Sequence, residues 1–253
     1  KKGLNLPRID LGISAFTDHD RNCLEFAIAQ GVDAVSQSFV ESAADMEAVR
    51  SAARDSGRGP FLIAKIERFE ALQNAEEIMD ASDGIMVARG DLGVEVPVED
   101  MAAIQKRLIG MANRKSKPVI TATQMMESMV NSPIPTRAEV SDVANAVLDY
   151  TDAVMLSAES ASGNYPVEAV TAMARICLGA EREPMSVKSQ HRLGETFSRC
   201  DETIALASMY AANHFPGIKA IISLTESGHT PLIMSRIRSS VPIYCYTRHP
   251  STQ

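Results

Sequence analysis

The sequence of 253 residues predicts an α/β fold: a TIM-type (β/α)8 barrel, only partly contained in this chain, followed by part of a second α/β domain. The expected strand starts recur at intervals of roughly one βα unit. Each expected strand also ends in polar residues or glycine, as in a barrel whose site draws on many strand ends, whereas a doubly wound sheet would gather them at one switch point. A polar stretch after about Glu181 then leads into a second αβ pattern.

Each element of the first region follows from apolar periodicity between capping and turn residues. Thr17-x-x-Asp20 and Ser42-x-x-Asp45 predict two helix starts, and Gly31 predicts the end of the first helix. The expected inner faces of these helices are Leu24, Ala27 and Ile28, then Met46, Val49 and Ala53. The predicted strands are residues 32–40, 61–66, 84–88, 118–123 and 153–158. The later predicted helices are residues 71–79, 137–148 and 167–178. A further helix, between the third and fourth strands, is expected to have Met101, Ile104, Leu108 and Met111 on its inner face.

The second region begins with a polar linker over residues 182–196, which places the predicted domain boundary between 1–180 and 181–253. A helix with Ile204, Ala205, Ser208, Met209 and Ala212 on one face precedes predicted strands at 220–224 and 241–246. Between these strands, residues 225–231 combine hydroxyls and a glycine before a helix expected to have Pro231 at its first position. Such a loop can bind phosphate, although most turns of this kind are only helix caps.

Composition and charge exclude several classes of protein. A net charge of −7, without a basic stripe that carries aromatic residues, disfavours a nucleic-acid or membrane-surface role. The four cysteines stand far apart and predict reduced thiols, mostly in the core, of a cytoplasmic protein. No run reaches transmembrane length and no apolar signal segment precedes the first helix. The chain begins with Lys1 rather than Met, so we expect a fragment or a protein missing its beginning.

Charged residues follow two neighbouring predicted strands. Because strand side chains alternate, Lys65 and Glu67 are expected to face the same side, and the next strand could bring Asp91 beside them. Two carboxylates flanked by Lys65 and Arg89, without paired His or Cys ligands, suit Mg²⁺ and an anionic substrate better than zinc. Spacing alone leaves the alternative open that these residues form salt bridges at the rim.

Other motifs favour structural roles. Gly90 and Gly93 lack the third glycine and the downstream acid of a dinucleotide-binding fingerprint. The five histidines are scattered without ligand spacing, and Ser157 and Ser160 lack a nucleophile elbow. The methionines Met125, Met126 and Met129 predict core or subunit packing.

Several longer strings resemble the pyruvate kinase family, in the family's order and over nearly the whole chain. They are Ile63-Ala-Lys65-Ile-Glu67, Ile85-Met-Val-Ala-Arg89-Gly-Asp91-Leu-Gly93, Ala122-Thr-Gln-Met-Met-Glu-Ser-Met129, Pro135-Thr-Arg-Ala-Glu139, Ser141-Asp-Val-Ala-Asn-Ala-Val147 and Ala153-Val-Met-Leu-Ser157-Ala-Glu159. The resemblance starts at Lys2-Gly-Leu-Asn-Leu-Pro7. It implies a middle-to-late part of the catalytic barrel and the start of a C-terminal regulatory domain.

The resemblance implies a role for each matching residue. Lys65 matches the catalytic lysine that stabilises charge on the transferring phosphoryl group, and Glu67 and Asp91 match the divalent-metal ligands. Ala88, Arg89 and Gly90 match the segment that holds the substrate carboxylate. Thr123 matches the threonine at the proton-delivery face of the enolate, and Ser38 matches a serine at the rim. The loop that holds the phosphate of an allosteric effector is matched by Thr225, Ser227, Gly228 and Thr230. His229 and Pro231 depart from that loop's usual residues, as Arg8 departs elsewhere, so the effector's identity stays open.

As a whole, the resemblance implies a cytoplasmic, homotetrameric, allosteric enzyme of glycolysis that transfers the phosphoryl group of phosphoenolpyruvate to ADP, giving pyruvate and ATP. Mg²⁺ or Mn²⁺ is the implied cofactor, and K⁺ could serve as a second ion. The family's first barrel strands, its lid domain and the end of its C-terminal domain have no counterpart in these 253 residues, so this portion alone is expected to be inactive. The alternatives are a metal-dependent lyase or aldolase of pyruvate-like acids, or an inactive fragment acting in assembly.

Overall fold

The computed structural model describes residues 14–55, 59–183, 196–197, 199–239 and 241–252. The chain divides into two compact units, Lys1–Ile176 and Cys177–Gln253. Several sequence features lie wholly or largely outside the described residues: the start of the family resemblance at residues 2–7, the turn at 56–60, the polar linker at 182–196, and the positions Arg8 and His191.

The first unit is built on a parallel sheet. Its strands are β1 (Ala34–Gln37), β2 (Phe61–Ile66), β3 (Gly84–Ala88), β4 (Val119–Ala122) and β5 (Ala153–Met155). They are hydrogen-bonded in the order β1-β2-β3-β4-β5. Because each described strand pairs with its neighbour in sequence and the order never reverses, the sheet has the arrangement of a barrel wall rather than that of a doubly wound sheet. The predicted α/β class is therefore confirmed.

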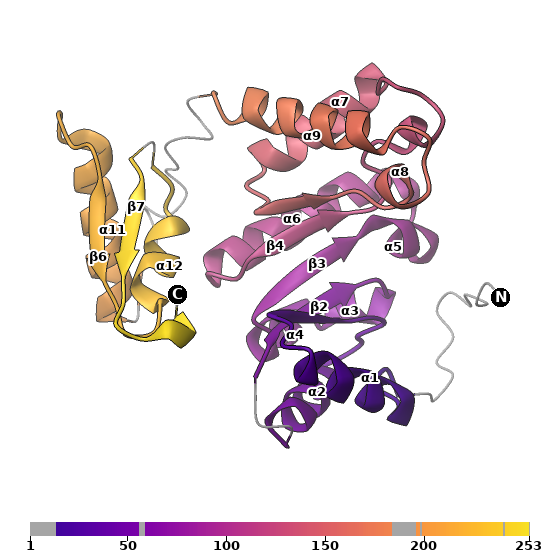
Figure 1. Ribbon diagram of the computed structural model, residues 1–253, viewed down its shortest axis with the longest axis horizontal. Helices are drawn as coiled ribbons and strands as arrows, with labels where there is room; N and C mark the ends of the chain where they lie inside the picture. Colours follow the sequence, from indigo (N-terminus) through magenta and orange to yellow (C-terminus); the bar gives the residue numbers. More distant parts are fainter. Residues whose placement is uncertain (1–13, 56–58, 184–195, 198, 240, 253) are drawn as a thin grey trace. The chain divides into compact units, whose positions relative to one another are not determined.

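Helices precede, connect and follow these strands, because parallel neighbours need a crossover between them. They are α1 (Asp18–Ala29), α2 (Ala43–Asp55), α3 (Phe69–Gln73), α4 (Ala75–Ala81), α5 (Arg89–Glu95), α6 (Met101–Arg114), α7 (Arg137–Leu148), α8 (Ala158–Ala161) and α9 (Pro166–Ala180), with the 3₁₀ helices η1 (Val98–Asp100) and η2 (Glu127–Val130). In Figure 1, α3, α5 and α8, which follow β2, β3 and β5, lie on the same side of the sheet. That side is the carboxyl-terminal rim of the strands.

Local capping explains where the predicted helices start. The Thr17 hydroxyl accepts a hydrogen bond from the Asp20 amide, and an Asp20 carboxylate oxygen accepts one from the Thr17 amide at 2.8 Å, so the predicted box is complete. The Asp45 carboxylate accepts from the amides of Glu41 and Ser42, each at 2.9 Å, at the start of α2. These bonds satisfy amides that have no partner inside the helix.

The core lies where the sheet meets its helices. Every residue of β3 is buried, as expected for a central parallel strand covered on both faces. At Gly84, which opens β3, an added Cβ would lie 3.0 Å from a Phe61 ring carbon and from the Pro118 carbonyl oxygen, so a larger residue would require the ring and the backbone to shift. The predicted core role of the methionines is confirmed, since Met125, Met126 and Met129 are fully buried.

The structure corrects several predictions. The helix predicted at 71–79 is two helices, α3 and α4, that meet at Asn74. The strands predicted at 32–40, 118–123 and 153–158 are shorter, because the ladder pairs between neighbouring strands end inside the predicted ranges. Helix α5 was not predicted, because two glycines dilute its helical pattern. The four cysteines are free, but three are exposed and Cys177 is half-buried, so the predicted core location is wrong.

The second unit holds α11 (Cys200–His214), β6 (Ile221–Leu224), α12 (His229–Ser235), β7 (Ile243–Tyr246) and η3 (Pro250–Thr252). Its two strands pair in parallel, and its core consists of Ala205, Met209, Ile233, Met234 and Ile237. The predicted inner position of Ile204 is wrong, since 55% of it is exposed. Pro231 is the third residue of α12 rather than the first.

Candidate active site

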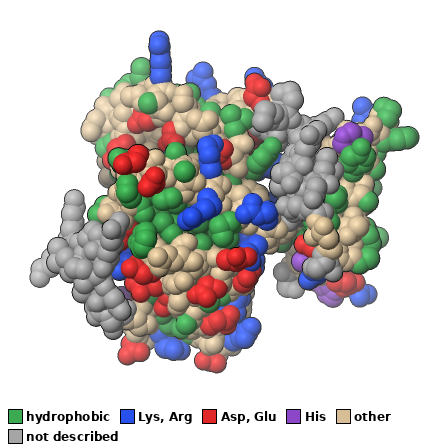
Figure 2. Space-filling view, turned by 180° about the vertical axis from the view of Figure 1, so that it is seen from behind, with side chains coloured by type: hydrophobic (Ala, Val, Ile, Leu, Met, Phe, Trp, Pro, Cys, Tyr) green, Lys and Arg blue, Asp and Glu red, His purple; other side chains and the backbone are tan. Residues whose placement is uncertain are grey.

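The carboxyl-terminal rim of the first unit collects most of the predicted site residues. Ser38 follows β1, Lys65 and Glu67 lie at the end of β2, Arg89 follows β3, and Thr123 follows β4. In the register, Ile66 of β2 lies beside Val87 of β3, and Ala88 lies beside Ala122 of β4. The ends of these strands are therefore level, which is where (β/α)8 enzymes place their sites. Acidic and basic side chains are interspersed on the face of the molecule that Figure 2 shows.

Lys65, Glu67 and Ser38 form a contiguous cluster. Lys65 Nζ lies 2.5 Å from Glu67 Oε1 and donates a hydrogen bond to Ser38 Oγ at 2.8 Å. Glu67 is 1% exposed, and its Oε2 accepts the Phe39 amide at 2.7 Å. The expectation that Lys65 and Glu67 face the same side is confirmed. The lysine side chain is 23% exposed, so its charge reaches solvent while the carboxylate is enclosed.

Asp91 lies in the first turn of α5, directly after the strand that pairs with β2. It is half-buried and follows Ala88 by three residues. Two carboxylates that come from adjacent strand ends, without cysteine or histidine, form a hard oxygen donor set that fits Mg²⁺ or Mn²⁺. Among the described residues, no group of three or more His, Cys, Asp and Glu side chains could hold a metal, so water or substrate oxygens would have to complete the coordination.

Arg89 contacts protein groups rather than open space. It is 8% exposed. Its Nε and Nη2 donate to the Thr123 carbonyl oxygen at 3.1 and 2.9 Å, and Nη2 donates to that of Gln124 at 3.0 Å. Nη1 donates to Asp142 Oδ1 at 2.8 Å and lies 3.3 Å from Gln105 Oε1. The guanidinium therefore holds the loop after β4.

The backbone that Arg89 holds is strained. Thr123 and Gln124 have φ angles of 65° and 53°, in the left-handed region that residues with a Cβ rarely adopt, and a β-branched threonine is a marked outlier there. The Thr123 hydroxyl accepts the Gly90 amide at 2.6 Å and donates to the Ala122 carbonyl. These bonds bring the ends of β3 and β4 together and place the Thr123 hydroxyl at the rim.

Two buried residues near the site, Glu159 and Glu95, and the half-buried Arg68 were not singled out from the sequence. Glu159 is fully buried, and its carboxylate accepts the amides of Met126 and Ser157. Arg68 and Glu95, behind Glu67, form an ion pair at 3.7 Å. The sequence did hold a signal for these two residues. Arg68 comes shortly after a buried strand and Glu95 lies within an apolar stretch, and charged residues in such positions are often paired. Their partners, however, depend on tertiary contacts.

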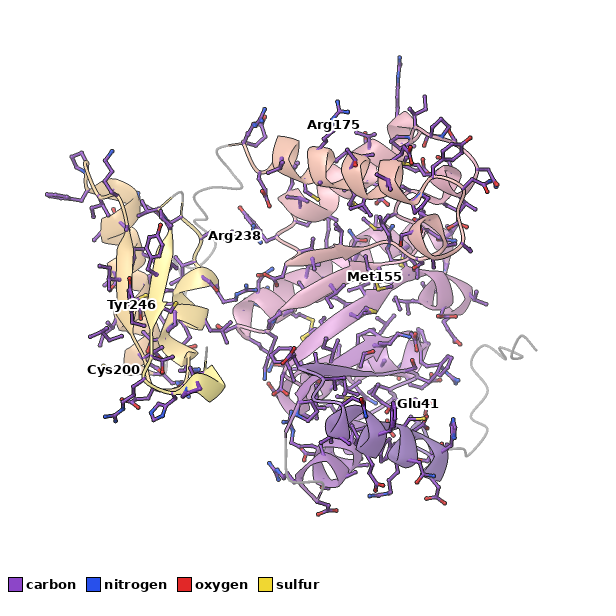
Figure 3. All side chains as sticks on the ribbon, viewed as in Figure 1. Glu41, Met155, Arg175, Cys200, Arg238 and Tyr246 are labelled. Carbon is purple, nitrogen blue, oxygen red and sulfur yellow. The ribbon has the colours of Figure 1, made fainter. Side chains whose placement is uncertain are left out.

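The predicted effector loop lies in the second unit. The Thr225 hydroxyl accepts the Gly228 amide at 2.9 Å, and Gly228 has a φ of 79°. A cavity of about 550 Å³ is lined by Arg199, Ser227, Gly228, His229 and Leu232. Beside it, Asp201 lies between Arg199 and His229, and the hydrogen bond from Arg199 holds the pKa of the Asp201 carboxyl well below its usual range. In Figure 3, the labelled Cys200 marks the start of α11 next to this group.

Comparisons with known proteins show which family the chain matches. The family model "Pyruvate kinase, barrel domain" matches residues 1–170, and "Pyruvate kinase, alpha/beta domain" matches residues 202–253. Pyruvate kinase II of Salmonella typhimurium is 52% identical over 254 residues, which cover 99% of this chain and 53% of that protein. The pyruvate kinase of Haemophilus influenzae is 49% identical over 99% of this chain and 53% of its own length, and pyruvate kinase 1 of Trypanosoma brucei brucei is 43% identical over 100% and 51%.

The fold and these matches define the class of the chain, which is part of a (β/α) barrel followed by an α/β domain. The chain spans about half the length of the relatives it matches. It belongs to the pyruvate kinase family. The family is metal-dependent, and the alternative of a lyase or aldolase is not supported. Within the described residues, none of the helices has the length and hydropathy needed to cross a bilayer.

Proposed function

We propose that the complete protein transfers the phosphoryl group of phosphoenolpyruvate to ADP in a Mg²⁺-dependent reaction. The bond between phosphorus and the enol oxygen breaks, a bond to the terminal phosphate oxygen of ADP forms, and the resulting enolate takes a proton at carbon to give pyruvate. The observation that carries this proposal is the Ser38, Lys65 and Glu67 cluster at the rim, with a partly exposed ammonium directly above a buried carboxylate. Phosphoryl transfer is accelerated chiefly by positioning and by positive charge around the equatorial oxygens.

Lys65 supplies the charge that the reaction needs. Glu67 Oε1 and Ser38 Oγ hold its ammonium from two sides, so little reorganisation is required when negative charge develops on the phosphoryl oxygens. Ser38 is therefore proposed to orient Lys65 at the rim of the substrate site. A divalent ion held by Glu67 and Asp91 would add positive charge at the phosphoryl group and at the enol oxygen. Mg²⁺, Mn²⁺ and a further K⁺ remain proposals.

Thr123 is proposed to stand at the proton-delivery face. Its hydroxyl accepts the Gly90 amide and donates to the Ala122 carbonyl. Delivery to a substrate carbon would require the hydroxyl hydrogen to leave the Ala122 carbonyl and to be replaced by a proton from solvent. The backbone from Ala88 to Gly90, at the start of α5, is proposed to receive the substrate carboxylate. For Arg89 the buried contacts support a positioning role, because its guanidinium is occupied by the loop that carries Thr123.

The experiment replaces Lys65 with Met in the complete protein. A methionine keeps most of the side-chain volume and removes the charge, so kcat should fall by about a hundredfold or more while the substrate Kd changes little. Steady-state ATP formation measures kcat, and a direct measurement of phosphoenolpyruvate binding gives the substrate Kd separately. Lys106→Met removes a lysine paired with Asp149 outside the rim cluster and serves as the control. Unchanged turnover in Lys65→Met would refute the assignment.

The loop over residues 225–230 is the proposed regulatory site of the protein. The cavity beside Ser227, Gly228 and His229 supports binding of a phosphorylated effector at the loop that also contains Thr225 and Thr230. A homotetramer in the cytoplasm, and the division into a catalytic barrel portion (1–180) and a regulatory domain (181–253), are proposed from family membership. Sedimentation of the complete protein as a monomer would contradict the tetramer.

A further inference from the structure

Arg68 lies directly behind the proposed metal ligand Glu67. Its backbone is extended, with φ −111° and ψ 153°, so its side chain leaves the chain on the side opposite to Glu67. The guanidinium is 13% exposed and lies among three carboxylates: Nη2 is 3.4 Å from Glu41, and Nε is 3.6 Å from Glu70 and 3.7 Å from Glu95. Glu41, labelled in Figure 3, follows β1, while Glu95 ends the helix after β3. One side chain therefore joins three consecutive loops of the rim.

The contact with Glu95 reaches the second proposed ligand. Glu95 and Asp91 are four residues apart in α5, so they lie on the same face of that helix. The Glu95 side chain is 0% exposed, and the Nε atom of Arg68 and the Oε1 atom of Glu95 are both inaccessible to solvent. In such surroundings the attraction between unlike charges is weakly screened. The pair therefore draws the face of α5 that bears Asp91 towards the end of β2 that bears Glu67.

We propose that Arg68 is a positioning residue: its ion pair with Glu95 sets the separation of the Glu67 and Asp91 carboxylates, and thereby the affinity of that pair for a divalent cation. The proposal rests on the metal site of the proposed function. Arg68 touches neither the cation nor the substrate. It acts through the backbone, since Glu67 precedes it directly and α5 moves as one short rigid element. Residues that orient metal ligands in this way commonly contribute ten- to hundredfold to metal affinity.

A purely structural role predicts something different. A buried ion pair that only stabilised the fold would change the unfolding temperature and leave cation affinity alone. The chain offers a matched control at the opposite end of the same strands. Arg50 of α2 lies 3.2 Å from Asp83, just before β3, and Asp83 also accepts the Leu62 amide of β2. This pair likewise ties a helix to β2 and β3, but at the amino-terminal end.

The test measures Mn²⁺ binding to the complete protein without substrates, by the electron paramagnetic resonance signal of free Mn²⁺. Arg68→Met and Glu95→Gln should each raise the Mn²⁺ Kd about ten- to hundredfold. Arg50→Met should leave it unchanged. Arg68→Lys keeps the positive charge but loses the branched guanidinium that reaches several carboxylates, so it should give an intermediate Mn²⁺ Kd. Thermal unfolding of each variant is followed in parallel.

The double variant Arg68→Met with Glu95→Gln removes both charges of this pair, so neither partner is left buried by the loss of the other, and its thermal unfolding shows whether it is folded. It should lose no more affinity than either single variant, because the same link is broken only once. Mn²⁺ binding unchanged in the double variant overturns the inference, as does an equal loss in Arg50→Met. Glu67→Gln and Asp91→Asn separate the two proposals: if both retain full Mn²⁺ affinity, the metal site itself is wrong, and if they lose it while the double variant does not, only the positioning role fails.

Discussion

Thr123 and Gln124 are single residues at the rim whose backbone dihedral angles lie outside the favoured regions. Both have positive φ angles, and so does Phe39, whose amide is held by the buried Glu67 carboxylate. Each such residue costs on the order of 1–2 kcal/mol unless its surroundings compensate. Here the compensation is visible, because Arg89 holds the carbonyls of Thr123 and Gln124 with charge-assisted hydrogen bonds. Strain of this kind concentrates at sites where a side chain must be presented in one orientation.

Gln124 offers a direct measurement of that strain. Its side chain is exposed, so Gln124→Gly should raise the free energy of unfolding by about 1 kcal/mol by removing the left-handed penalty. Gln73→Gly, at an exposed position in ordinary helical backbone of α3, should instead lower it by roughly 0.5–1 kcal/mol. Urea denaturation of both variants provides the comparison. Equal destabilisation by the two changes would show that the Gln124 backbone is not strained.

At the scale of elements, Glu139 connects a helix to the loop before it. Its carboxylate accepts the Thr136 amide at 2.7 Å within the capping box of α7, and it accepts the Ser128 amide of η2 at 2.7 Å. Burial raises the pKa of Glu139, but hydrogen bonds from Ser128 and Thr136 outweigh it, and the net shift is below the usual 4.5. The ionised carboxylate is therefore the form that the folded state prefers.

A depressed pKa in the folded state contributes stability above the unfolded pKa, and that contribution disappears as pH falls through the folded value. We expect the free energy of unfolding to decline as pH drops below about 4.5, and Glu139→Gln to reduce the steepness of this decline. At pH 7 the same variant should cost about 1 kcal/mol, as loss of a cap does. Denaturant titrations across this pH range measure both effects. Glu127→Gln, at an exposed position in η2, is the control, and matching pH profiles for the two variants would contradict the link.

The elements also show what a sequence can predict. Helix α7 was predicted with its observed bounds, because its apolar spacing is a local signal, and the structure adds the capping box at Thr136. That Lys65 and Glu67 face the same side followed from strand alternation alone, whereas their ion pair was left open. The contacts of Arg89 with Thr123 and of Arg68 with Glu95 could not be predicted, because they depend on the register and tilt of neighbouring βα units. Helix α5 was missed because its glycines oppose the helix that tertiary packing imposes.

For the whole molecule, the proposed effector site predicts a change in regulation without a change in chemistry. Replacing Ser227 and Thr230 with Ala should move the activation curve of the complete protein to higher effector concentration and leave fully activated turnover unchanged, because only affinity for one conformational state is altered. Titrating turnover with phosphorylated sugars and nucleotides measures this shift. Ser235→Ala, at the other end of α12, is the control. An activation curve identical to that of the unmodified protein would show that this loop is not the effector site.

The unbroken order of the five strands has a consequence for how the chain folds. Among the described strands of this unit, β2, β3, β4 and β5 each pair with the strand that precedes them in sequence, so each of these ladders closes a loop of a single βα unit. Loop closure of this length costs little conformational entropy, and contacts of low sequence separation form early. During synthesis on the ribosome, each new strand therefore meets an edge that is already in place, and the sheet can grow in the direction of translation.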